Sequence, residues 1–156
     1  VGIDYKSVDG KILCFSKSGS TIENKDPISW AIRCADEGAG EIILTSIEKD
    51  GLMNGYDCET LDKISSKVKI PVIVSGGAGN YDHMLKAFNS GASAVAAASI
   101  YHFTEKTPSE AKKFLTKNNI CGHVIQHHLF RYEGAFSSIH LSLPVCFCAL
   151  QLHLWP

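Results

Sequence analysis

A glycine-rich turn in the middle of the chain has the composition of a phosphate-binding loop. A β-branched run ends at Ser75, and Gly76, Gly77 and Gly79 follow before a helical pattern begins at Tyr81. Without Cβ atoms, the backbone of such a turn can approach an oxyanion closely, and the amides that open the next helix point toward it. The alternative is that the glycines only turn the chain tightly. Both interpretations predict a strand, a turn and a helix in this order.

A carboxylate follows the first apolar residues of the chain. Val1, Gly2 and Ile3 are typical of the end of a buried strand, which would carry Asp4 at its carboxyl-terminal tip. Ligands bind at this end of the strands in parallel α/β proteins, and a carboxylate there can transfer a proton. The competing interpretation is an aspartate that caps a loop.

Alternating strand and helix patterns surround these residues. Asp9-Gly10, between two alternating runs, indicates a small hairpin, and Asp26-Pro27 indicates the start of a helix. Further strands are expected over 41–45, 70–75 and 91–99, a short turn over 100–103, and helices over 27–37, 58–68, 81–90 and 108–118. Because helices separate these strands, we expect them to lie parallel in an α/β fold.

The segment 46–57 is longer and more polar than a connection between a strand and a helix requires. It follows an expected strand on the side where ligands bind, and it contains Asp50 and Gly51. Long polar loops at this position often contribute to binding sites. Asp50 and Gly51 are therefore candidates for ligand contacts, with a plain turn as the alternative.

Charge and cysteine content argue against several classes of protein. The chain has 15 Lys and Arg against 16 Asp and Glu, without a basic run interleaved with aromatics, so we expect no nucleic acid partner. Six cysteines show no paired C-x-x-C motif, which indicates neither a zinc site nor a disulfide framework. We expect reduced thiols in a cytoplasmic protein, with no metal, no cofactor and no membrane segment.

The last 36 residues differ in composition from the rest of the chain. From Cys121 onward only Arg131 and Glu133 are charged, and five of the seven histidines lie there. The pair His127-His128 is not expected to bind a metal, because adjacent residues do not share a helix face. We interpret 1–120 as one domain and 121–156 as an apolar, His- and Cys-rich tail of foreign or frame-shifted origin.

Several motifs follow one another along residues 1–119. They are Ile3-Asp4-x-Lys6, Val8-Asp9-Gly10, Gly38-Ala39-Gly40-Glu41-Ile42 with Leu44-Thr45-Ser46-Ile47, Asp50-Gly51 with Gly55-Tyr56-Asp57, Ser75-Gly76-Gly77-Ala78-Gly79, and Ala97-Ala98-Ser99 with His102-Phe103. In these motifs the chain resembles the cyclase subunit of imidazole glycerol phosphate synthase, a (β/α)8 TIM barrel of histidine biosynthesis. The resemblance covers strands five to eight, which implies a parallel (β/α) half-barrel. The start at Val1, without a Met, fits a fragment.

The resemblance also implies a function and a site. Asp4 would be one of two catalytic carboxylates. One phosphate of a bis-phosphorylated substrate, a phosphoribulosyl formimino aminoimidazole carboxamide ribotide, would lie on the backbone of Asp50-Gly51, Gly76-Gly77 and Ala98-Ser99. The hydroxyls of Ser18, Thr45 and Ser75 would line the pocket. A partner glutaminase would supply the ammonia that converts this substrate into imidazole glycerol phosphate and an aminoimidazole carboxamide ribotide.

Three departures from the family pattern keep alternatives open. Glu48 stands where the family usually has Asp, Tyr5 fills a position that is usually small, and the loop after Ser18 is shortened. These departures favour a paralogue that uses ammonia to amidate a surface sugar. A noncatalytic phosphate-binding half-barrel is the other alternative, because the second catalytic carboxylate would precede Val1. Four strands alone would leave unpaired edges, so we expect the fragment to self-associate.

Overall fold

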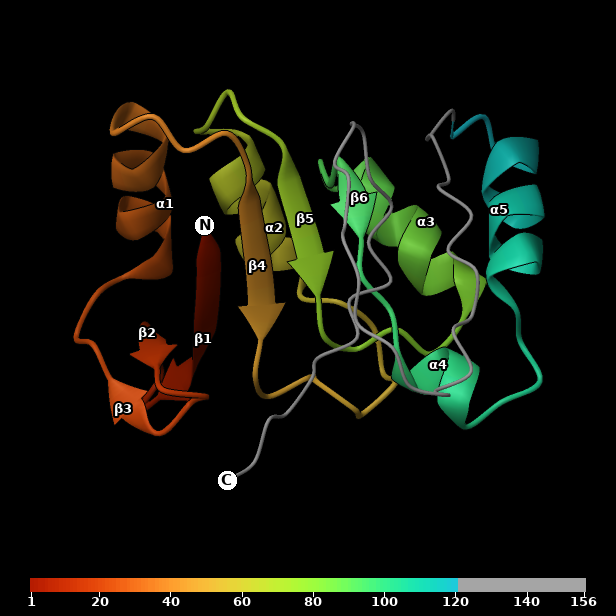
Figure 1. Cartoon of the computed structure of the whole chain (residues 1–156), viewed down its shortest axis with the longest axis horizontal. Coiled ribbons are helices and arrows are strands. Elements are labelled where there is room, and N and C mark those ends of the chain that lie inside the picture. Colours follow the sequence, from red (N-terminus) through yellow and green to blue (C-terminus); the bar gives the residue numbers. More distant parts are fainter. Residues whose placement is uncertain (121–156) are drawn as a thin grey trace, which may run out of the picture.

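A six-stranded sheet organises residues 1–120, the part of the chain that the computed structural model describes (Figure 1). The strands are β1 (Gly2–Val8), β2 (Lys11–Ser16), β3 (Thr21–Ile22), β4 (Ile42–Ser46), β5 (Val72–Ser75) and β6 (Ala94–Val95). Their order across the sheet is β3-β2-β1-β4-β5-β6. Strands β1, β4, β5 and β6 run parallel, whereas β2 and β3 add antiparallel pairs at one edge. The predicted α/β class with a mostly parallel sheet is confirmed.

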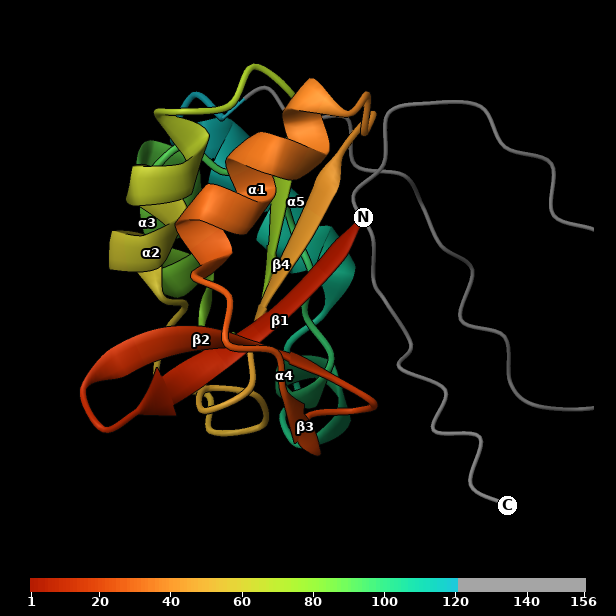
Figure 2. The same cartoon turned by 90° about the vertical axis from the view of Figure 1, so that its left-hand side faces the viewer.

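Five helices accompany the strands over residues 1–120, and three of them cover one face of the sheet. The five are α1 (Pro27–Asp36), α2 (Cys58–Ser65), α3 (Tyr81–Asn89), α4 (Ser99–His102) and α5 (Pro108–Lys117). Figure 2 shows α1, α2 and α3 on the same side of the strands, with the tip of the β1–β2 hairpin bent beneath them. The core between the two layers includes Ile3 and Leu44 from strands, and Leu61, Ile64 and Met84 from helices. Burial of these apolar side chains supplies most of the free energy that holds the helices on the sheet.

The local signals predicted from the sequence are present in the structure. Asp9 and Gly10 both have positive φ, 51° and 75°, in a two-residue loop that pairs Val8 with Lys11. This backbone is the type I′ turn that joins twisted antiparallel strands. The side chain of Asp26 accepts a hydrogen bond of 2.8 Å from the amide of Ser29 and caps α1. Such a cap satisfies an amide that has no partner within the helix.

Three strands have bounds that differ from those expected from the sequence. The strand expected over 91–99 is only Ala94–Val95, and Ser99 opens the short helix α4 where a strand end and a turn were expected. β5 begins at Val72 rather than at residue 70, because Pro71 has no amide to donate to the sheet. β1 continues to Val8, so Asp4 lies within this strand and not at its tip. The interpretation of 121–156 lies outside the described residues.

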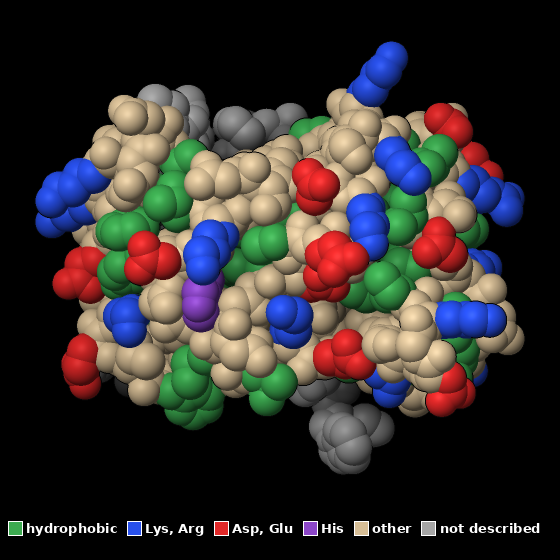
Figure 3. All heavy atoms as spheres, turned by 180° about the vertical axis from the view of Figure 1, so that it is seen from behind, with side chains coloured by type: hydrophobic (Ala, Val, Ile, Leu, Met, Phe, Trp, Pro, Cys, Tyr) green, Lys and Arg blue, Asp and Glu red, His purple; other side chains and the backbone are tan. Residues whose placement is uncertain are grey.

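The outer face of the helix layer carries charges of both signs. Figure 3 shows Lys and Arg side chains interspersed with Asp and Glu side chains on this face. Two ion pairs link successive helical turns, Arg33 with Glu37 at 2.8 Å and Lys63 with Glu59 at 2.6 Å. Exposed pairs of this kind add little to stability, because solvent screens them. Over residues 1–120, none of the helices has the length and apolar character needed to cross a membrane.

Candidate active site

Three polar side chains lie side by side on the sheet face away from the helices. In the parallel register, Asp4 of β1 pairs with Thr45 of β4, and Thr45 pairs with Ser75 of β5. Paired residues of neighbouring strands share a face, and the strands lie about 4.8 Å apart. All three residues are partly buried, whereas their neighbours Ile3 and Leu44 are buried against the helices. The structure therefore brings Asp4, Thr45 and Ser75 into one row near the carboxyl ends of the parallel strands.

The glycine turn after β5 is packed against the loop that follows β4. Gly76 and Gly77 have positive φ, 90° and 105°. A Cβ at Gly77 would lie 2.2 Å from the carbonyl oxygen of Gly55, and one at Gly79 would lie 1.9 Å from that of Met53. The space expected for an oxyanion in the Cβ direction is thus filled by backbone of the same chain. The need for glycine here comes from this packing and from positive φ.

Asp50 and Gly51 belong to the same loop and lie beside the glycine turn. The amide of Asp50 donates a hydrogen bond of 3.1 Å to the carbonyl of Ser46 at the end of β4. A Cβ at Gly76 would lie 3.4 Å from that amide nitrogen, which places the two segments in direct contact. Two of the three backbone segments expected to hold a phosphate are therefore adjacent.

Three successive residues of the β4–α2 loop are bonded to three other strands or turns. The amide of Gly55 donates to the carbonyl of Gly77 at 2.7 Å, and the hydroxyl of Tyr56 donates to the carbonyl of Ala96 at 2.9 Å. The carboxylate of Asp57 accepts from the hydroxyl of Tyr5 on β1 at 2.8 Å. These bonds hold the loop against the carboxyl-terminal end of the sheet.

The remaining expected site residues lie at the same end of the fold. Ser18 is exposed in the turn between β2 and β3, where a Cβ at the adjacent Gly19 would lie 3.4 Å from the side chain of Ile47. Ala98 precedes α4 and Ser99 is its first residue, and no side chain caps this helix. Apart from Asp4, Thr45 and Ser75, all expected site residues thus lie in the segments that follow β2, β4, β5 and β6.

Comparison with known proteins identifies the family of this chain. The family model described as "Histidine biosynthesis protein" matches residues 1–107. The chain belongs to this histidine biosynthesis family. Over 121 residues it is 46% identical to imidazole glycerol phosphate synthase subunit HisF of Chlorobaculum parvum, and 45% identical to that of Chlorobaculum tepidum. The protein of the same name from Endomicrobium trichonymphae is 49% identical over 121 residues.

These matches cover unequal shares of the two proteins. Each covers 77% of this chain but only 46% to 48% of the relative. The chain spans about half the length of the curated relatives it matches. The resemblance inferred from the motifs is confirmed, and it extends over the described domain.

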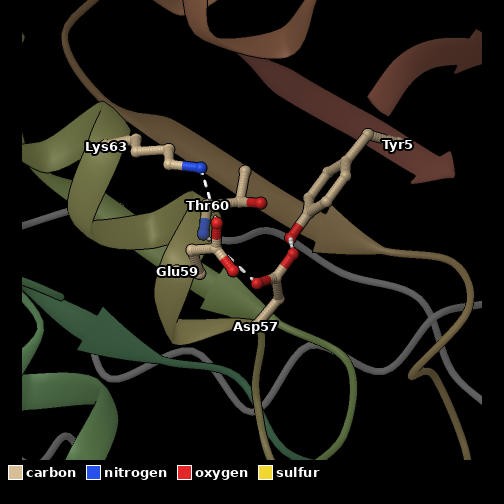
Figure 4. A network of polar contacts seen from close by, with 5 residues as sticks. All are labelled: Tyr5, Asp57, Glu59, Thr60 and Lys63. Atoms are coloured by element: carbon tan, nitrogen blue, oxygen red, sulfur yellow. Dashed lines mark hydrogen bonds and ion pairs between the residues drawn. The ribbon is translucent and has the colours of Figure 1, made fainter. Parts of the chain in front are cut away.

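Tyr5, one of the three expected departures from the family pattern, lies on the other side of the sheet from Asp4. Its ring is 2% exposed among core residues, and Figure 4 shows its hydroxyl directed at Asp57, at the start of α2. Asp57 also accepts from the amide of Thr60 at 3.2 Å and so caps this helix. Since Tyr5 faces the helices, this departure does not change the surface around Asp4.

Sequence reasoning missed His83, which lies in the first turn of α3 against the glycine turn. Its Nδ1 accepts a hydrogen bond of 3.3 Å from the amide of Gly79. Burial, followed by the charge of Lys86, lowers the pKa of His83 and favours the neutral ring that this bond requires. The only signal in the sequence was that His83 lies four positions after Gly79. This spacing is too common near helix starts to indicate a contact.

A cavity of about 200 Å³ beside β1 was also not expected from the sequence. Asp4 lines it together with Gly2, Ile3, Cys14, Phe15, Ser16, Glu23, Lys25 and Trp30. Glu23 accepts a hydrogen bond from the hydroxyl of Ser16. Thr45 and Ser75 do not line this cavity, so it adjoins the polar row only at Asp4.

Proposed function

We propose that this chain contributes the carboxyl-terminal half of the cyclase subunit of imidazole glycerol phosphate synthase. The observation that supports this most is the row of Asp4, Thr45 and Ser75 across neighbouring strands, beside the glycine turn. The identity of 45% to 49% to HisF proteins over 121 residues supports the same assignment. The polypeptide that supplies the other half would complete the parallel barrel.

In this proposal Asp4 moves a proton during the reaction of ammonia with the substrate. Ammonia from a partner glutaminase attacks the phosphoribulosyl formimino aminoimidazole carboxamide ribotide, and cyclisation with elimination gives imidazole glycerol phosphate and an aminoimidazole carboxamide ribotide. A carboxylate that is partly buried on a rigid strand keeps its position through such a step. The second carboxylate belongs to the other half of the enzyme, and the reaction takes place in the cytoplasm.

The phosphate nearest this half binds to backbone amides in the proposal. The segments are Asp50-Gly51, Gly76-Gly77 and Ala98-Ser99. Packing of Asp50 against Gly76 supports a common role for the first two segments. The hydroxyls of Thr45 and Ser75 donate to the substrate from the strands, and Ser18 contributes from the β2–β3 turn.

The experiment is reconstitution of the enzyme from two chains. The full chain is co-expressed with the amino-terminal half of the Chlorobaculum parvum HisF protein, and the purified complex is assayed for imidazole glycerol phosphate with ammonium as the nitrogen source. We expect turnover in the complex and none in either half, with loss of turnover in Asp4→Asn. A folded complex that binds the substrate without turning it over would contradict the proposal.

A further inference from the structure

The β4–α2 loop joins the glycine turn to the segment that follows β6 through two consecutive residues. The amide of Gly55 donates a hydrogen bond of 2.7 Å to the carbonyl of Gly77, and the hydroxyl of Tyr56 donates one of 2.9 Å to the carbonyl of Ala96. In Figure 1 the loop that follows β4 passes below the end of β5 toward α4 before it returns to α2. The segments that follow β5 and β6 are thus both hydrogen-bonded to one dipeptide, through the amide of Gly55 and the hydroxyl of Tyr56.

Tyr56 has the burial and rigidity that such a connection needs. Its side chain is 4% exposed, and a phenol ring has few rotatable bonds between the backbone and the hydroxyl. A buried hydroxyl without an acceptor would destabilise the folded state, which keeps this hydrogen bond formed in the folded protein. The position of the ring is therefore coupled to the position of the Ala96 carbonyl.

The amide and the carbonyl of Ala96 are both hydrogen-bonded. Its amide donates to the carbonyl of Val74 on β5 at 2.8 Å, and its carbonyl accepts from Tyr56. After Ala96 the chain reaches α4, which begins at Ser99 without a side-chain cap.

We propose that Tyr56 is a positioning residue that fixes the spacing between the Gly76-Gly77 turn and the Ala98-Ser99 segment, so that both can contact one phosphate group. This inference rests on the proposed function, which assigns both segments to the same phosphate. Tyr56 itself touches neither the phosphate nor the reacting atoms. Its hydroxyl acts through the carbonyl of Ala96, two residues before Ala98.

The test compares Tyr56→Phe with the wild-type full chain, with inorganic phosphate as the probe. Phosphate affinity is measured by calorimetry, and the free energy of unfolding is measured by urea titration in parallel. Loss of the hydroxyl releases the Ala96 carbonyl, so we expect phosphate affinity to fall about tenfold. Equal phosphate affinity in Tyr56→Phe and the wild type would overturn the inference.

Tyr81→Phe is the control for the loss of a tyrosine hydroxyl and its hydrogen bonds outside the proposed site. The hydroxyl of Tyr81 donates to Glu110 at 2.9 Å and accepts from the amide of Thr107 at 2.9 Å, between α3 and α5. This variant also loses a hydroxyl and its hydrogen bonds, but we expect its phosphate affinity to stay within about twofold of the wild type. A tenfold loss in both variants would show that affinity follows stability alone, which would overturn a positioning role.

A measurement on the wild type covers the case in which Tyr56→Phe does not fold. Tyrosine is labelled at the ring carbon that bears the hydroxyl, and its NMR resonances are followed while phosphate is added. We expect the Tyr56 resonance to shift and the Tyr81 resonance to stay in place. Phosphate binding without a shift at Tyr56 contradicts the inference alone, whereas absence of phosphate binding contradicts the proposed function on which it rests.

Discussion

The hydroxyl of Tyr5 donates a hydrogen bond of 2.8 Å to the Oδ2 atom of Asp57, across 52 positions of sequence. Oδ1 of the same carboxylate accepts from the amide of Thr60 and caps α2. Burial, together with the negative charge of Asp57, raises the pKa of Tyr5 far above its usual value, so the phenol remains a donor. One carboxylate thus joins the β1 strand to the start of a helix.

Removal of this donor lowers the stability of the domain. In Tyr5→Phe the partly buried carboxylate of Asp57 loses a hydrogen bond, so we expect the free energy of unfolding to fall by about 2 kcal/mol. Urea denaturation measures it. The exposed hydroxyl of Tyr81 gives a control, since Tyr81→Phe should have a smaller effect. Equal losses in the two variants would argue against a special contribution of the Tyr5–Asp57 bond.

The same carboxylate makes stability depend on pH in acid. Burial alone would raise the pKa of Asp57, but hydrogen bonds from Thr60 and Tyr5 outweigh it and hold the pKa below its usual value. Its contribution is therefore complete above the unfolded pKa of about 3.9 and is lost as the pH falls through the lower folded value. We expect the wild type to lose stability more steeply than Asp57→Asn between about pH 5 and pH 2. Parallel curves from urea titrations across this range would contradict the linkage.

A comparison of Gly77→Ala with Gly38→Ala separates the effect of a steric clash on stability from the effect of backbone strain. A Cβ at Gly77 meets the Gly55 carbonyl at 2.2 Å, whereas one at Gly38, with a similar positive φ of 96°, meets no atom within 4 Å. Strain alone should lower the free energy of unfolding by about 1–2 kcal/mol in Gly38→Ala. We expect a loss of ~4 kcal/mol or more in Gly77→Ala, because the loop backbone must move as well. Similar melting temperatures for the two variants would show that the loop yields easily.

Asp4→Asn tests the proposed proton transfer. The amide keeps the shape of the carboxylate and removes its basicity, so in the reconstituted enzyme we expect turnover to fall by roughly 10² or more. Binding of the substrate should stay within about tenfold, since the phosphates are held elsewhere. Steady-state kinetics with ammonium measure both quantities. Unchanged turnover would remove Asp4 from the mechanism.

Cys14 is expected to be unreactive in the folded protein. Burial, followed by the charge of Asp26, raises the pKa of its thiol to about 11, so little thiolate forms at pH 8. Cys58 is less buried than Cys14. We expect iodoacetamide at pH 8 to modify Cys58 at least tenfold faster, as measured by mass spectrometry of the separate peptides. The difference should disappear in urea, and equal rates without urea would contradict the burial of Cys14.

Features that depend on neighbouring residues were predictable from the sequence. The Asp9-Gly10 turn needs only two residues that accept positive φ, and the cap at Asp26 needs only an amide three positions later. To place Asp4 beside Thr45, one must know which residues of each strand share a face and which strands are neighbours. The repeated strand and helix pattern and the family motifs supplied this information.

Features that depend on distant contacts were not predictable. β6 ends at Val95, whereas the apolar run in the sequence continues to Ala98, and the carbonyl of Ala96 bonds to a tyrosine forty positions away. The glycine turn was interpreted from its composition alone. Glycine is also required there because the carbonyls of Gly55 and Met53 occupy the space that a Cβ would need. The positions of these carbonyls depend on how a separate loop packs.

The bond from Tyr56 to Ala96 also sets an order in which the domain can be completed during synthesis. When Tyr56 leaves the ribosome, its acceptor lies forty residues further along the chain and has not yet emerged. The hydroxyl is then hydrated, and the loop closes only when β5 and β6 join the growing sheet. The end of the domain that carries the proposed site is consequently the last to become rigid, and a ribosome that stalls before residue 96 exposes it in an open form.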